Sequence, residues 1–266
     1  EMQTEKCFKR MDKTITDKLL EDYRNGDRRL ILLDYDGTLV KFKSSPEEAV
    51  PDPELRSVLR SLIEKEGNEL VVVSGRDKDT LERWFGDMGL NIIAEHGVWI
   101  KTRKDQWSMI EQLEDSWKEK IRPVLESYVI KTPGAFVEEK GHSLAWHYRK
   151  ADQNQAQAQI SEMKETLHNM ISNLNVGILN GNKVIEIKNI GVNKGRAVKK
   201  WTEGKEWDFI LAVGDDWTDE DMFEVLPEKG YSIRVGYTNS RARFNLKNAD
   251  EVRDLIRKIA GMEDTG

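Results

Sequence analysis

Short apolar runs alternate with segments of helical periodicity in the first third of the chain. The runs Leu30–Leu33, Leu70–Val73 and Ile92–Ala94 are continuous, which is typical of strands buried on both faces. The segments beside them predict helices from their apolar spacing, one over Thr14–Tyr23, one carrying Leu55, Val58, Leu59, Leu62 and Ile63, and one carrying Leu81, Trp84, Phe85 and Met88. The resulting βαβαβ order implies a parallel sheet with crossover helices.

The middle of the chain has a different pattern. A long helix is predicted over about Met109 to Tyr128, and a second helix carries Ile160, Met163, Leu167, Met170 and Ile171. Two hairpins are predicted from paired strand patterns around turn residues, Ala135–Glu138 with Leu144–Tyr148 and Val176–Leu179 with Val184–Ile187. Helices and hairpins without βαβ order indicate an inserted α+β domain.

The last third returns to the alternation of the first. Helices and strands are predicted in the order Asn193–Trp201, Phe209–Val213, Thr218–Leu226, Tyr231–Val235 and Asp250–Ile259. The fold class predicted is therefore α/β, with a Rossmann-like parallel-sheet core built from both ends of the chain. We expect this core to comprise residues 1–102 and 188–266, and the inserted domain to comprise residues 103–187.

Composition narrows the classes of partner. The 266 residues carry a net charge of −6, and no basic run exceeds three residues, which disfavours duplex nucleic acid and anionic membranes. No apolar run approaches about 18 residues, so no transmembrane helix is expected. Cys7 is the only cysteine, which fits a reducing, cytoplasmic location. The chain has no signal-peptide pattern and no initial Met, so we expect a piece of a longer protein.

Two carboxylates follow the first apolar run. Asp34 and Asp36 are two residues apart, with Gly37 allowing a sharp turn beyond them. Ligands of open α/β sheets bind beyond the carboxyl ends of the strands, so both carboxylates can point into one crevice. The alternative is an ordinary acidic turn between strand and helix.

A second acidic group follows the predicted strand Phe209–Val213. Thr218 and Asp221 have the spacing of a capping box, so Asp219–Asp221 can be explained as helix-cap residues alone. Asp215 and Asp216 precede that cap and are not explained by it. Acidic groups at two strand ends repel each other unless a cation lies between them, and a few carboxylates with room for water and phosphate suit Mg²⁺.

A hydroxyl and a lysine complete the candidate chemistry. Ser74 follows Leu70–Val73, where it can bind an anion or simply cap a helix. Lys194 lies at a helix start, where a cation is unfavourable to the helix dipole, and this conflict favours a function over a solvated surface lysine. Together these residues are suited to phosphoryl transfer through a carboxylate nucleophile, a general acid and a metal ion.

Four motifs, DYDGT, VVVSGRD, NKG and VGDDWTDED, resemble in this order the motifs of the haloacid dehalogenase superfamily of phosphatases. The resemblance implies that Asp34 is the nucleophile and Asp36 the general acid and base, with Ser74 and Lys194 holding the phosphate. It further implies an Mg²⁺ site whose residues are Asp34, Asp36 through its carbonyl, Asp215, Asp216 and Asp219.

The insert narrows the resemblance. The segments AEHGVWIK, FVEEKGHSLAWHYR and KVIEIKNIGVNKGRAV are similar to trehalose-6-phosphate phosphatases, especially fungal ones. This similarity implies that the insert is a C2-type cap domain that reads a sugar phosphate. It implies that the sugar-binding residues are Glu138, Lys140 and Glu186, with Arg76, His96 and Arg149 as further substrate-binding residues. In fungi such a module is typically part of a larger trehalose-synthesising protein.

Two alternatives remain open from the residues. The predicted core motifs do not separate phosphatases of different sugar phosphates, such as sucrose phosphate, because only the cap carries specificity. A non-catalytic regulatory module of a trehalose-synthesising assembly is the other alternative. Such modules usually lose the nucleophile or the metal carboxylates, whereas Asp34, Asp36, Lys194 and Asp215 are all present here.

Overall fold

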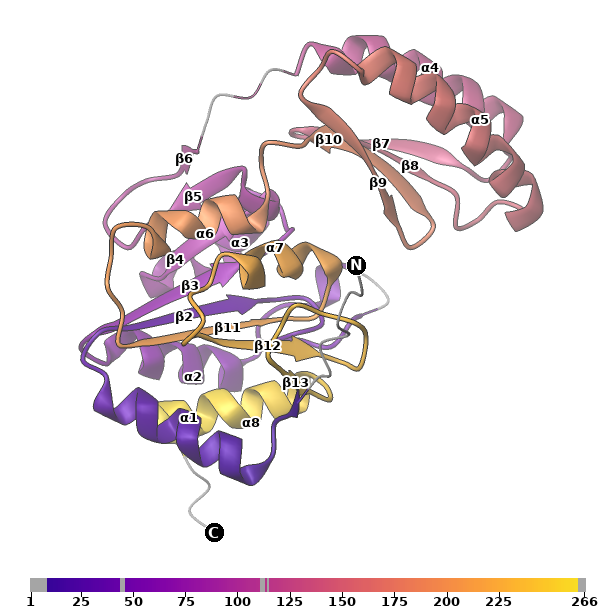
Figure 1. The fold of residues 1–266 in the computed structure, drawn as a ribbon. Helices are drawn as coiled ribbons and strands as arrows, with labels where there is room; N and C mark the ends of the chain where they lie inside the picture. The colour runs from indigo at the N-terminus through magenta and orange to yellow at the C-terminus, as the bar shows by residue number, and fades with distance from the viewer. Residues whose placement is uncertain (1–8, 44–45, 111–112, 114, 263–266) are drawn as a thin grey trace, which may run out of the picture. The chain divides into compact units, whose positions relative to one another are not determined.

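The computed structural model describes residues 9–43, 46–110, 113 and 115–262. The chain divides into two compact units (Figure 1). Residues 1–110 and 193–266 form the first, here called the core unit, and residues 111–192 form the second, here called the insert unit. Cys7 lies outside the described residues.

The core unit contains a nine-stranded sheet in the order β1-β13-β12-β11-β2-β3-β4-β5-β6. All neighbouring pairs from β1 to β4 are parallel, while β5 and β6 are added antiparallel. The strands are β1 (Lys9–Arg10), β2 (Arg29–Asp34), β3 (Asn68–Val73), β4 (Asn91–Ala94), β5 (Trp99–Lys101), β6 (Ser108–Met109), β11 (Phe209–Gly214), β12 (Tyr231–Val235) and β13 (Phe244–Leu246). The predicted α/β class with a parallel sheet is confirmed.

Helices cover both faces of this sheet (Figure 1). They are α1 (Lys13–Asn25), α2 (Pro53–Glu64), α3 (Lys78–Phe85), α6 (Lys194–Thr202), α7 (Glu220–Glu224) and α8 (Ala249–Ala260). Ile31 and Leu33 pack in the apolar cluster with α1, α2, α3 and α8, whereas Leu30 and Leu32 pack in the cluster with α6 and α7. Because successive strand residues face opposite sides, burial on both faces requires the continuous apolar run that the sequence has.

The insert unit is a four-stranded antiparallel sheet backed by two helices. Its strand order is β7-β8-β10-β9. The elements are α4 (Trp117–Lys131), β7 (Phe136–Lys140), β8 (Ser143–His147), α5 (Gln153–Ile171), β9 (Val176–Gly181) and β10 (Val184–Asn189). Leu144, Trp146 and Ile185 face the helices and are at most 2% exposed. The alternate positions of the strands form the other face, here called the open face.

The long helix predicted over about Met109 to Tyr128 was wrong in its first part. Met109 belongs to β6 and pairs with Trp99 of β5, so backbone pairing with the core sheet overrides the helical spacing of its apolar side chain. The helix itself begins at Trp117. Three residues of the predicted segment, at positions 111, 112 and 114, lie outside the described residues. The expected boundaries at residues 103 and 187 fall before β6 of the core sheet and within β10 of the insert sheet.

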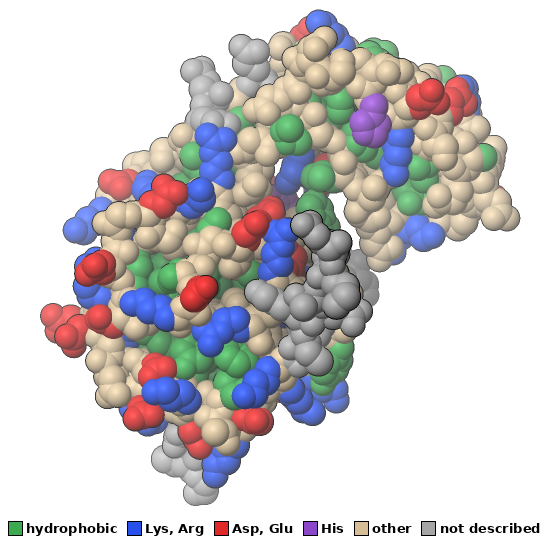
Figure 2. Space-filling model, in the orientation of Figure 1, with side chains coloured by type: hydrophobic (Ala, Val, Ile, Leu, Met, Phe, Trp, Pro, Cys, Tyr) green, Lys and Arg blue, Asp and Glu red, His purple; other side chains and the backbone are tan. Residues whose placement is uncertain are grey.

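The surface mixes charges of both signs. On the face drawn in Figure 2, acidic and basic side chains are interspersed over both units. None of the described helices has the length and the apolar composition needed to cross a membrane.

Candidate active site

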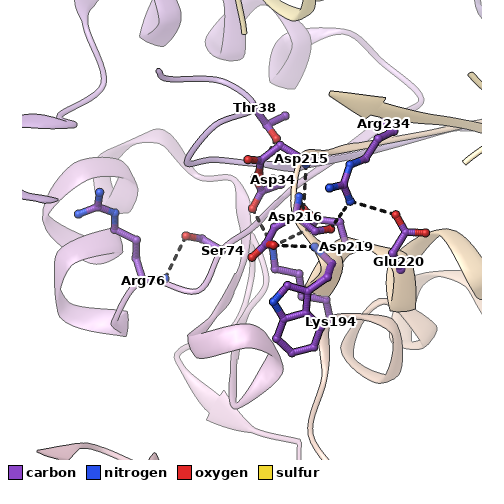
Figure 3. A network of polar contacts seen from close by, with 11 residues as sticks. Asp34, Thr38, Ser74, Arg76, Lys194, Asp215, Asp216, Asp219, Glu220 and Arg234 are labelled. Atoms are coloured by element: carbon purple, nitrogen blue, oxygen red, sulfur yellow. Dashed lines mark hydrogen bonds and ion pairs between the residues drawn. The ribbon is translucent and has the colours of Figure 1, made fainter. Parts of the chain in front are cut away.

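The predicted acidic residues lie at the carboxyl ends of neighbouring parallel strands. Asp34 is the last residue of β2, and Asp215 follows directly after β11, the strand paired beside it. Ser74 follows β3, which pairs with β2 on its other side. Figure 3 shows these side chains close together at this edge of the core sheet. The site therefore forms where the polar residues after three buried strands meet, as the strand pattern predicts.

Asp34 is 4% exposed and has two partners within the site. Lys194 donates from Nζ to Oδ1 at 2.7 Å, and Thr38 donates from its hydroxyl to Oδ2 at 2.8 Å. Lys194 is the first residue of α6, whose N-cap Asn193 accepts a hydrogen bond from the Arg196 N–H. Lys194 is only 2% exposed and lies at a helix start, and its ion pairs with Asp34 and Asp219 compensate for this unfavourable position of a cation.

Asp219 fixes the turn after β11. Its Oδ2 accepts hydrogen bonds from the backbone N–H groups of Asp215 and Asp216, both at 3.0 Å, while its Oδ1 accepts from Lys194 at 2.7 Å. Asp216 instead turns Oδ1 to the Trp217 N–H at 2.7 Å, as the N-cap of the 3₁₀ turn Trp217–Asp219. Asp219 is thus both a capping residue and a buried partner of Lys194.

Two glycines allow the carboxylates to approach the backbone. Gly37 has φ +83°, and a Cβ at this position would collide with the carboxylate of Asp215. Gly214 lies against the Asp219 carboxylate in the same way. Substitution at Gly37 is unfavourable for two reasons, since the left-handed conformation disfavours side chains and the space is already filled.

Three carboxylates converge closely enough to share a cation. One oxygen from each of Asp34, Asp215 and Asp219 lies within 4.8 Å of the others. Burial, followed by the negative charge of Asp219, raises the pKa of Asp34 well above its ordinary value, and the same two causes raise the pKa of Asp215 to about 6. Burial lowers the pKa of Lys194, but Asp219 and Asp34 outweigh it and raise that pKa. One ammonium group therefore leaves the cluster with excess negative charge, and this donor set suits a divalent cation.

Arg76 links Ser74 to Asp36. The Arg76 N–H donates to the Ser74 hydroxyl oxygen at 3.1 Å, and its guanidinium makes two hydrogen bonds to the Asp36 carboxylate. His96 lies against this turn, because a Cβ on Gly75 would collide with the His96 ring. His96 also has φ +56°, an uncommon conformation for a residue with a side chain. The structure thus places Asp36, Ser74, Arg76 and His96 next to one another in the core unit.

The other expected substrate-binding residues lie on the insert unit. Glu138 and Glu186 are both paired with Ala145 of the central strand β8, so they lie on the open face in one row. Lys140 lies on the same face two residues after Glu138. Arg149 follows β8 and donates to the Asn182 carbonyl at 3.1 Å, in the turn between β9 and β10.

Comparison with known proteins identifies the family. A model of the trehalose-phosphatase family matches residues 32–251, which include every predicted catalytic, metal-binding and substrate-binding residue. The chain belongs to the trehalose-phosphatase family. It is 36% identical over 257 residues to a bifunctional trehalose-6-phosphate synthase/phosphatase of Thermoproteus tenax. That alignment covers 97% of this chain and 35% of the relative, so the chain spans about a third of that protein's length.

Solved structures agree with this membership of the trehalose-phosphatase family. The C-terminal domain of Candida albicans trehalose-6-phosphate phosphatase has a TM-score of 0.83 and 29% identity, over 98% of this chain and 100% of that one. The C-terminal domain of a Candida albicans trehalose synthase regulatory protein has a TM-score of 0.74 and 15% identity, over 94% and 99% of the two chains, and shares the fold alone. The predicted core fold is confirmed, and a solved haloacid dehalogenase-like hydrolase of B. subtilis, with a TM-score of 0.59 and 16% identity, shares it as a fold alone.

Three residues near these sites of the trehalose-phosphatase chain were not singled out from the sequence. Thr38 binds Asp34, and Arg234 donates to the Asp216 carbonyl and to Glu220. On the insert unit, His147 contacts Glu138. The position of Arg234 near the end of β12, next to β11, is a signal that the strand-end rule could have used.

Proposed function

We propose that this chain hydrolyses trehalose 6-phosphate to trehalose and phosphate, as a step of trehalose synthesis. The observation that carries the proposal is the buried Asp34, which is held by Lys194 and Thr38 beside two further carboxylates. A carboxylate at a fixed strand end, next to a buried ammonium group, is suited to attack phosphorus. Membership of the trehalose-phosphatase family supports the choice of substrate.

In the proposed reaction Asp34 is the nucleophile. Its carboxylate oxygen forms a bond to phosphorus while the bond from phosphorus to the sugar oxygen breaks. Asp36 gives a proton to the leaving sugar oxygen and then takes one from the water that hydrolyses the aspartyl-phosphate. Lys194 and Ser74 hold phosphoryl oxygens, and the products are trehalose, phosphate and the regenerated Asp34 carboxylate.

We propose Mg²⁺ as the cation of this site. Asp34, Asp215 and the Asp36 carbonyl would hold it, with Asp216 and Asp219 supporting, and the excess negative charge of the cluster favours binding. When bound, Mg²⁺ neutralises the repulsion between carboxylates and phosphate and aligns the reacting groups. Asp219 is already committed to Lys194 and to two backbone N–H groups, so we assign it to orienting the site.

We propose that the insert unit is the cap domain and selects the sugar. Its open face presents Glu138 and Glu186 in one row, with Lys140 beside them. Glu138 has 43% and Lys140 55% of its side chain exposed, so both can reach a ligand. Carboxylate and ammonium groups are suited to bind sugar hydroxyls, and Arg76, His96 and Arg149 would add further contacts to the substrate.

Phosphate release from trehalose 6-phosphate tests the proposal. It is measured with Mg²⁺ and with EDTA, beside sucrose 6-phosphate and glucose 6-phosphate as alternative substrates. Release from the trehalose ester alone, lost in EDTA, supports the reaction, the metal and the specificity together. Release from another ester would assign a different sugar phosphatase. A folded protein without release from any ester would favour a regulatory module, the role named for the Candida albicans protein that shares this fold.

We further propose that this phosphatase module belongs to a larger trehalose-synthesising protein in the cytoplasm. Its Thermoproteus tenax relative is named as a bifunctional synthase/phosphatase and is about three times longer than the matched region. The single cysteine of the sequence supports a reducing compartment.

A further inference from the structure

His147 makes a direct contact with Glu138 on the open face of the insert unit. The two residues lie on neighbouring strands, with the His147 Nε2 at 2.8 Å from the Glu138 Oε2. An ionised carboxylate only accepts hydrogen bonds, so this contact requires His147 to carry its proton on Nε2. The two side chains are 27% and 43% exposed. A ligand can therefore reach both side chains while they contact each other.

Phe136 holds the His147 ring in place. The two residues are directly paired across β7 and β8, and their rings stack with centroids 4.8 Å apart and an interplanar angle of 13°. A ring stacked on one side and hydrogen-bonded at its edge has few orientations left. Glu138, by contrast, has a flexible side chain whose ordering costs conformational entropy when a ligand binds.

We propose that His147 is a positioning residue that fixes the Glu138 carboxylate for sugar binding, with Phe136 restraining the His147 ring. This inference rests on the proposed function, in which Glu138 binds the sugar. His147 is hydrogen-bonded to Oε2 of Glu138, and Lys140 Nζ lies 4.0 Å from the same oxygen. Glu138 Oε1 accepts no hydrogen bond from the described residues, so this oxygen is the one presented to a sugar hydroxyl. Pre-ordering this carboxylate reduces the entropy lost on binding.

A role in folding alone does not explain this contact. The apolar cluster of the insert unit lies on the opposite face of its sheet, where Leu144 and Trp146 are fully buried against α4 and α5. His147 alternates with these residues and points away from that core. Its removal leaves the buried cluster intact, so the loss should appear in substrate binding rather than in the fold.

The test compares His147→Ala, His147→Gln and Glu138→Ala on trehalose 6-phosphate and on a small aryl phosphate. His147→Ala should raise KM for the sugar phosphate about tenfold, the size expected for loss of one ordered hydrogen bond, with little change in kcat. His147→Gln should have a KM close to that of the wild type, because the glutamine amide can donate to Glu138 Oε2. The KM for the aryl phosphate, which has no trehalose to bind, should change less in each variant than the KM for trehalose 6-phosphate.

The double variant Glu138→Ala/His147→Ala decides between positioning and direct contact. If His147 acts through Glu138, the double variant should be no worse than Glu138→Ala alone. Additive losses, or a normal KM in His147→Ala beside a raised KM in Glu138→Ala, would overturn this inference and leave the proposed function standing. Wild-type protein that hydrolyses the aryl phosphate but not trehalose 6-phosphate would overturn both.

Discussion

Arg76 holds the carboxylate of Asp36 through two hydrogen bonds, from Nε to Oδ2 at 2.8 Å and from Nη2 to Oδ1 at 2.6 Å. The guanidinium also lies over the Trp84 ring, 4.8 Å from its centroid. The residue proposed as general acid and base therefore has an orientation set by a planar, two-pronged partner. A lysine cannot reproduce that geometry, since its ammonium group is a single point charge.

Arg76→Lys should therefore lower kcat about tenfold on both trehalose 6-phosphate and a small aryl phosphate, because Asp36 acts on either leaving group. Steady-state kinetics with the two substrates measures this. Arg83→Lys is the matched control, since Arg83 lies on α3 and contacts Thr80 of the same helix. An unchanged kcat on both substrates would contradict the orienting role of Arg76.

Asp34→Asn should abolish turnover while the protein stays folded. The amide has nearly the shape of the carboxylate but is not a nucleophile, so we expect a loss of at least about 10³-fold in kcat. Phosphate release gives the rate, and thermal unfolding followed by circular dichroism reports the fold. Retention of full activity would exclude Asp34 as the nucleophile.

Addition of Mg²⁺ should stabilise the protein, because a cation that binds only the folded state relieves repulsion among Asp34, Asp215 and Asp219. At a free concentration one hundred times its Kd, a bound ligand adds about 2.7 kcal/mol. Thermal unfolding with Mg²⁺ and with EDTA measures the shift. Asp215→Asn should reduce it, whereas the exposed Asp79→Asn on α3 should not. Equal melting temperatures with and without Mg²⁺ would exclude the proposed site.

The strand-end carboxylates and Lys194 were predictable from the sequence, but the contacts that join them were not. Asp34 and Asp215 follow continuous apolar runs, and such runs identify central parallel strands whose ends meet at one edge. The ion pair between Lys194 and Asp219 depends instead on how closely the start of α6 approaches the start of α7. A Cβ on Gly195 would collide with the Asp221 carbonyl, so this glycine permits the approach, and no local pattern reveals that.

At Met109 the local pattern predicts the wrong secondary structure. The apolar residues around this position have helical spacing, yet Met109 pairs with Trp99 as a strand. Helical spacing at the end of a segment does not show where the helix begins, and here pairing with the edge of the core sheet makes Met109 part of a strand. The open face of the insert unit was partly predictable, since alternation places Glu138 and Lys140 together, but the contact of Glu138 with His147 requires the register of β7 and β8.

Asp52 should make stability depend on acid pH. It caps α2 by accepting from the Leu55 N–H at 2.8 Å, and Arg253 of α8 donates to it at 2.5 Å. Burial raises the pKa of Asp52, but these hydrogen bonds outweigh it, and the pKa falls below its ordinary value of 3.8. Because the folded protein favours the charged form, this stabilisation is present above the unfolded pKa and is lost as pH falls through the folded pKa.

Asp52→Asn keeps a good helix cap but removes the charge. At neutral pH the variant should be less stable than the wild type, by no more than about 1 kcal/mol because the pair is partly exposed and screened. At an acid pH below the folded pKa of Asp52 the difference should vanish, since the carboxyl is then protonated in both states. Urea unfolding of both proteins at the two pH values measures this. A difference of equal size at both pH values would show that the Asp52 charge contributes nothing and that only the cap matters.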